Sequence, residues 1–223
     1  PVLDGHVFMT ALVIFGLGSM LLVVQSMLAA PQPGRSPAAL GAVQFGSNAS
    51  AVAMAVALIA FAWSWVAMPE TLSGKAYYEV LFWGGGHALQ FSWTILMLLG
   101  WLWLAGACGG RVMLSPRLVV LMFVLALASV FVTPYAYLAY DIASVEHRNL
   151  HTWAMRIGGG LAIAPVMIAV ILAMLPQRSL SAAQRPLRAA LWSSMAIFAL
   201  GGIIGVIIAG NNVRIPAHYH GSI

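Results

Sequence analysis

The sequence predicts an all-α fold: a polytopic bundle of transmembrane helices, with six spanning helices and the start of a seventh. Composition is the first reason, because 62% of the residues are hydrophobic and only 7% are charged, whereas a soluble domain carries roughly 25% charged residues. A chain with so little charge cannot cover its surface in water, so a lipid bilayer is expected to surround it. The second reason is a series of long apolar runs, since a spanning helix needs ~20 apolar residues.

Six apolar runs follow one another, at residues 7–30, 43–68, 77–107, 117–140, 153–175 and 189–210. Proline and glycine mark most of the gaps between them, as is typical of boundaries. Pro134 and Pro165 lie inside runs and are expected to kink or locally unpair their helices. The short connections predict one transmembrane domain over residues 1–223. The missing initiator Met and a helix that begins near Arg214 lead us to expect a fragment of a longer subunit.

The charged residues predict the orientation of the helices. The loops after the first, third and fifth runs carry arginines and no acidic residue: Arg35, Arg111, Arg117, Arg178, Arg185 and Arg188. By the positive-inside rule this side is cytoplasmic, so the first run crosses from outside to inside. The formal net charge of +5 is therefore interpreted as a topology signal, and no nucleic-acid partner is expected.

Two histidines form an H-x-H pattern, His218 and His220, in the segment Ile215-Pro-Ala-His-Tyr-His. On a helix, a step of two residues turns the side chain by ~200°, so the two rings leave opposite faces. Each ring can then bind a different metal, and imidazole is the usual axial ligand of haem iron. The pattern indicates a helix between two haems. The alternative is a pair of interfacial histidines that reach toward water.

His87 follows the sequence Trp83-Gly-Gly-Gly, about ten residues into the third run. It is expected ~15 Å from the outer end of its helix, at 1.5 Å per residue. An ionisable side chain at such a depth is costly and favours a function. The glycines allow a flat cofactor or another backbone to approach closely. The alternative is a packing groove beside a neutral histidine that is hydrogen-bonded to a neighbour.

His147 and His151 have the i, i+4 spacing that places two side chains on one helix face, as a two-histidine metal site requires. They stand beside Glu146 and Arg148 in an outer loop or helix start. That polar setting favours solvated histidines, which is our prediction for them. Arg148 and Arg156 are also suited to pair with haem propionates.

The segment from Ala76 to His87, with its Leu-Phe-Trp-Gly-Gly-Gly-His sequence, resembles the start of the sixth helix of subunit I of haem–copper oxidases. The segment from Ile215 to His220 resembles that family's tenth helix and its H-[FY]-H motif. Three runs separate the two segments, and the inferred orientation also agrees with the family. The chain is thus similar to a portion of subunit I from helix four to the start of helix ten.

The resemblance implies an enzyme, a terminal oxidoreductase of cytochrome c oxidase type in the bacterial cytoplasmic membrane. His218 would be the proximal ligand of a high-spin haem, and His220 an axial ligand of a low-spin haem. His87 would bind a non-haem copper or iron. Electrons would come from cytochrome c or a quinol, other oxidase subunits would be partners, and O2 would be reduced to water.

The sequence departs from the family's copper site. It has no adjacent His-His pair, and the corresponding run carries Thr133-Pro-Tyr-Ala-Tyr instead. Phe91 stands where many members have a tyrosine, and Leu89 stands where the family has a glutamate. No catalytic residue is assigned. A nitric oxide reductase, or a haem-binding electron-transfer subunit without the copper site, is therefore an alternative. A helical transporter with His87 as a proton relay is a third, although it leaves the H-x-H unexplained.

Overall fold

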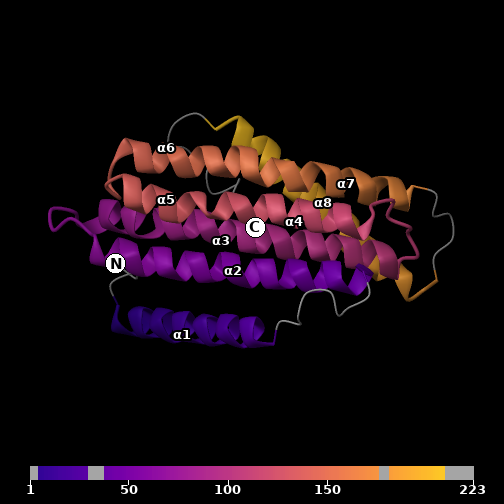
Figure 1. Ribbon diagram of the computed structural model, residues 1–223, viewed down its shortest axis with the longest axis horizontal. Coiled ribbons are helices and arrows are strands. Elements are labelled where there is room, and N and C mark those ends of the chain that lie inside the picture. The colour runs from indigo at the N-terminus through magenta and orange to yellow at the C-terminus, as the bar shows by residue number, and fades with distance from the viewer. Residues whose placement is uncertain (1–4, 30–37, 176–180, 209–223) are drawn as a thin grey trace. The chain divides into compact units, whose positions relative to one another are not determined.

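The computed structural model describes residues 5–29, 38–175 and 181–208, and these residues form helices and short connections without any strand. Figure 1 shows the helices: α1 (His6–Leu28), α2 (Ala38–Val66), α3 (Gly74–Ala107), α4 (Pro116–Val130), α5 (Val132–Ala139), α6 (Val145–Ala154), the π-helix η2 (Met155–Gly159), α7 (Gly160–Met174) and α8 (Gln184–Val206). The all-α prediction is confirmed. The expected seventh helix, with His218 and His220, lies outside the described residues.

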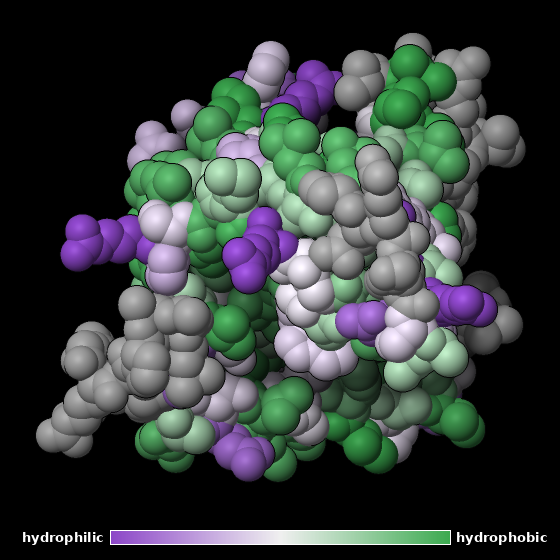
Figure 2. All heavy atoms as spheres, turned by 90° about the vertical axis from the view of Figure 1, so that its right-hand side faces the viewer, coloured by the Kyte–Doolittle hydropathy of each residue, from purple (hydrophilic) through white to green (hydrophobic). Residues whose placement is uncertain are grey.

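Among the described residues, six helical segments are long and apolar enough to cross a membrane: α1, α2, α3, α4 with α5, α6 through α7, and α8. Large hydrophobic side chains are exposed along them, such as Phe15 (70%) and Trp65 (68%). Figure 2 shows hydrophobic residues over much of one face, with hydrophilic residues at scattered positions. The described chain has the surface and helix lengths that suit a lipid environment.

The fifth span begins at Val145, eight residues before the apolar run that predicted it. The cause is Ser144, the N-cap of α6, whose Oγ accepts a hydrogen bond from the backbone N–H of His147 at 3.1 Å. The same hydroxyl donates to the backbone carbonyl of Asp141 at 2.6 Å. A serine cap of this kind typically stabilises a helix start by ~1 kcal/mol. The polar residues 145–152 therefore form helical turns that hydropathy alone cannot reveal.

The two prolines within runs behave differently. The fourth span breaks at Phe131, between α4 and α5, and Pro134 lies in the first turn of α5. Proline has no N–H to donate, and the first turn of a helix is the place where none is needed. The helix break just before Pro134 therefore confirms the predicted local unpairing there. Pro165 stays inside a continuous α7. The irregular turn of that span is the π-helix at Met155–Gly159.

The helices divide into two compact units. One contains Pro1–Ile95 and Pro116–Ala162, and the other contains Leu96–Ser115 and Ile163–Ile223. Within the first unit, α1 lies beside α2, α2 packs on α4 and α5, and α6 lies against α5 (Figure 1).

Small residues allow close helix packing inside the first unit. Its core joins three alanines from α2 and α3 to two larger side chains: Ala53, Ala57, Ala88, Phe91 and Val130. Beside this core, Ser50 and Ser92 share a hydrogen bond between their hydroxyls at 2.8 Å, and Ser92 Oγ donates to the carbonyl of Ser50 at 3.0 Å. Paired serines and small side chains are the usual means of helix association in membranes.

In the second unit, the buried Trp101 is the largest anchor. Its indole Nε1 donates to Ser194 Oγ at 2.9 Å, and its ring meets Phe198 edge-on at 5.6 Å between centroids. Near the end of α3, Gln184 Nε2 donates to the carbonyl of Ala107 at 3.3 Å. These contacts fix α3 and α8 together within this unit.

Candidate functional site

Three histidines from two helices lie together in the first unit. His87 comes from α3, and His147 and His151 come from α6. The ring centroids of His147 and His151 are 4.5 Å apart, and those of His87 and His151 are 5.8 Å apart. His147 and His151 are 0% and 1% exposed. The prediction that these two are solvated is wrong, because residues 145–154 are helical and the shared face of the two histidines packs inward against Tyr137.

The hydrogen bonds of two of these rings fix their tautomers. His87 Nδ1 lies 2.6 Å from the carbonyl oxygen of Trp83, and His151 Nδ1 lies 2.8 Å from that of His147. A carbonyl oxygen only accepts, so Nδ1 carries the proton in both rings and Nε2 keeps its lone pair. A backbone carbonyl that accepts from one ring nitrogen is the usual support of a metal-binding histidine.

Several buried ring nitrogens have no hydrogen-bond partner among the described residues: Nδ1 and Nε2 of His147, and Nε2 of His151. An unpaired buried polar group costs about 1–3 kcal/mol. A neutral His147 ring carries one donor and one acceptor, and both would bear this cost. A metal ion or another bound group would supply the missing partner for a ring nitrogen.

The spacing of the rings suits a shared metal, although their orientations do not converge. Metal–nitrogen bonds of ~2.0 Å in a tetrahedral site put two ring centroids roughly 5 Å apart, between the 4.5 Å and 5.8 Å observed. The rings are inclined by 51° and 60°. As they stand, no three His, Cys, Asp or Glu side chains in the described part of the chain could hold a metal ion. The residues fit a metal in type, burial and spacing, and the rings must turn to bind one.

Tyr137 completes the cluster from α5. Its side chain is 6% exposed, and its hydroxyl shares a 2.6 Å hydrogen bond with Ser64 Oγ of α2. Its ring stands perpendicular to that of His147, with centroids 4.8 Å apart. Sequence reasoning treated residues 133–137 only as the place of a missing histidine pair. The signal that could have found Tyr137 is a phenol inside an apolar span, which must hydrogen-bond there.

Aromatic packing accounts for two of the three glycines before His87. A Cβ on Gly84 would lie 2.7–2.9 Å from ring carbons of Tyr137, and one on Gly85 would overlap the ring of Phe61. A Cβ on Gly86 would meet nothing within 4 Å. Only Gly86 keeps the open approach that the sequence suggested for a flat cofactor.

Arg148 lies at the edge of the cluster. Its guanidinium carbon lies 4.8 Å from the ring centroid of Trp83. Its Nη2 forms an ion pair with Glu79 Oε2 at 3.6 Å. The ring centroids of Trp83 and His87 are in turn 4.7 Å apart. Both partners of the ion pair are partly exposed, so it contributes at most about 1 kcal/mol. Arg148 thus covers the Trp83 side of the site.

Comparisons with known proteins find relatives of this chain in two bacteria. An uncharacterized protein of Rickettsia prowazekii is 26% identical over 201 residues, which cover 75% of this chain and 39% of the relative. An uncharacterized protein of Aquifex aeolicus is 30% identical over 146 residues, which cover 65% of this chain and 34% of the relative. The chain therefore spans less than two fifths of the curated relatives it matches. No family model matches the sequence, and no solved structure matches it.

Proposed function

We propose that this chain is the core of a haem- and metal-containing respiratory oxidoreductase in the bacterial cytoplasmic membrane. It would resemble subunit I of haem–copper oxidases and reduce O2 to water, with electrons from cytochrome c or a quinol. The observation that carries the proposal is the meeting of His87 with the buried His147 and His151. Both ring nitrogens of His147 and the Nε2 of His151 have no hydrogen-bond partner among the described residues.

The proposed metal ligands differ from the family pattern in spacing. His147 and His151 are four residues apart on α6 and take the place of the adjacent pair that the sequence lacks. His87 would be the third ligand, through its Nε2, as the tautomer suggests. When bound, a copper or iron ion at these nitrogens and the haems on His218 and His220 would supply the electron transfer and the binding of a diatomic substrate.

Tyr137 is the proton donor that we propose for the reduction. Its phenol lies beside the His147 ring, and reduction of O2 to water consumes protons. Ser64 Oγ is positioned to return a proton to the phenolic oxygen, because the two oxygens are 2.6 Å apart. The buried apolar neighbours Ala60, Val80 and Ile142 keep bulk water away from this oxygen. Reduction of nitric oxide also consumes protons, so this phenol would serve as proton donor for either substrate.

The test is haem and metal content of the purified full-length protein. Pyridine haemochromogen spectroscopy should give two haems per polypeptide, and elemental analysis should give one further copper or iron. His147→Ala and His151→Ala should each lose the non-haem metal and retain haem. The matched control is His6→Ala, which removes an exposed histidine of α1.

The outcomes separate the alternatives. Haem without the additional metal would indicate an electron-transfer subunit, and loss of turnover with NO but not O2 in the variants would indicate a nitric oxide reductase. A protein without haem would refute the proposal and favour the transporter. Metal that survives both α6 variants would refute the three-histidine site while leaving the haem assignment intact.

A further inference from the structure

An apolar cleft of about 270 Å³ opens on the surface of the first unit, between α4–α5 and α6–η2. It is lined by Val132, Leu150, Trp153, Ala154, Ile157 and Gly158. Its one polar lining side chain, Ser129, already donates to the carbonyl of Leu125 at 3.0 Å. The cleft therefore offers almost only hydrocarbon to a ligand.

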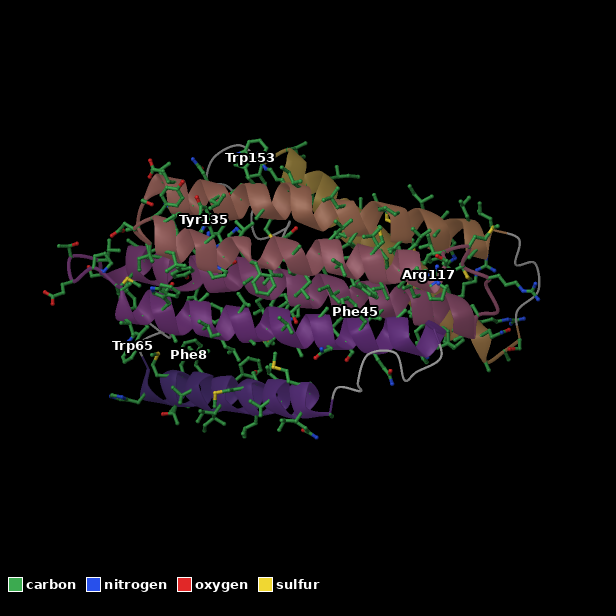
Figure 3. All side chains as sticks on the ribbon, viewed as in Figure 1. Phe8, Phe45, Trp65, Arg117, Tyr135 and Trp153 are labelled. Carbon is green, nitrogen blue, oxygen red and sulfur yellow. The ribbon has the colours of Figure 1, made fainter. Side chains whose placement is uncertain are left out.

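The π-helical turn shapes this cleft. In the π-helix the backbone of Gly158 packs directly on Ser129, since a Cβ at Gly158 would overlap the serine side chain. Beside this contact, Trp153 and Ile157 remain 56% and 58% exposed. Figure 3 labels Trp153 on α6. The mouth of the cleft thus has an aromatic and an aliphatic edge on the surface of the span.

An arginine without a carboxylate partner among the described residues stands at this mouth. Arg156 is exposed, and its guanidinium carbon lies 5.5 Å from the Trp153 ring centroid. It sits ~27 Å before the end of its span at Met174, at 1.5 Å per residue. The hydrocarbon core is ~30 Å thick. The guanidinium is therefore near the membrane boundary opposite the arginine-rich loops, and its long side chain can reach the headgroups there.

We propose that the cleft and Arg156 form a binding site for an anionic phospholipid. The acyl chain would lie in the cleft, and the phosphate would pair with the guanidinium. Two independent features favour this occupant: an apolar groove on a membrane-spanning helix, and a positive charge at the level of lipid phosphates.

The test is native mass spectrometry of the full-length protein released from detergent, with added phosphatidylglycerol or phosphatidylcholine of equal chain length. The wild type should retain phosphatidylglycerol preferentially. Arg156→Gln should reduce that preference about fivefold, as expected for one basic residue near a membrane surface. Lys75→Gln removes an exposed positive charge elsewhere and should leave the preference unchanged.

A second pair of variants tests the cleft itself. Ala154→Leu fills the groove and should weaken the retention of both lipids, while Ala164→Leu adds the same bulk at an exposed position of α7 outside it and should have no effect. Equal retention by the wild type, Arg156→Gln and Ala154→Leu would overturn the proposal. So would a photoreactive phenylalanine analogue at Ile157 that cross-links to another polypeptide segment instead of lipid. Lipid binding is measured here without haem or metal, so its failure is distinct from failure of the proposed oxidoreductase.

Discussion

Gly84→Ala should disturb the buried site, because its methyl group would occupy the space of the Tyr137 ring. Ring carbons of Tyr137 lie 2.7–2.9 Å from the position of the added Cβ, closer than real Cβ contacts allow. The ring must move, and with it the hydroxyl that shares a 2.6 Å hydrogen bond with Ser64. Gly86→Ala is the matched control, since its Cβ would meet nothing within 4 Å.

The expected difference between the two variants is about 3 kcal/mol in the free energy of unfolding. Overpacking of a well-packed interior costs about 1–3 kcal/mol, and loss of a hydrogen bond costs about 0.5–1.5 kcal/mol. Alanine is more favourable than glycine in a helix by about 1 kcal/mol. This contribution is the same in both variants, so it cancels in the difference between them. Gly84→Ala should be less stable than the wild type, and Gly86→Ala equal to it or more stable.

The assay is reversible unfolding of the purified protein in mixed micelles, followed by circular dichroism and by tyrosine absorbance. The tyrosine signal should change in the folded state of Gly84→Ala and stay unchanged in Gly86→Ala. If the two variants have equal stability and equal tyrosine spectra, the close approach of α3 to Tyr137 is wrong, and with it the position of the phenol beside His147.

Three further predictions concern neighbouring contacts. Ser64→Ala should cost about 1–3 kcal/mol because it leaves a buried phenol unpaired, and it should cost much less in a Tyr137→Phe background, which a double-mutant cycle of unfolding free energies measures. Gly158→Ala should lower the melting temperature through its clash with Ser129, and Ser129→Gly should recover part of the loss, whereas no recovery would place the strain elsewhere. His218→Ala should abolish the high-spin haem spectrum together with turnover, and a spectrum and turnover that both survive would contradict the haem assignment.

The fold could be predicted because each span contains a long apolar run. The number of spans follows from composition and length, and the break near Pro134 follows from the missing N–H of proline. The start of α6 could not be found this way. Residues 145–152 are polar, and only the cap at Ser144 and the burial of one face make them helical. A hydropathy argument therefore places them in a loop.

Of the three histidines that cluster, sequence analysis selected only His87 as a candidate ligand. His87 attracts notice because an ionisable group stands alone in an apolar run, whereas His147 and His151 look ordinary among Glu146 and Arg148. Their meeting depends on which face of α6 turns toward α3, and this face is decided by packing against Tyr137. Nothing local in the sequence reports such a long-range contact.

The π-helical turn lets this span carry one additional residue without turning the face of the site. An α-helix advances ~100° per residue, and a π-turn is often equivalent to one inserted residue. Deleting one residue from Met155–Gly159 would restore an ordinary α-helix. Because the wider π-turn absorbs the extra residue, this deletion would leave His147 and His151 on the face that meets Tyr137. A relative that is one residue shorter in this segment could therefore carry the same histidines in the same register, without the close contact of Gly158 with Ser129.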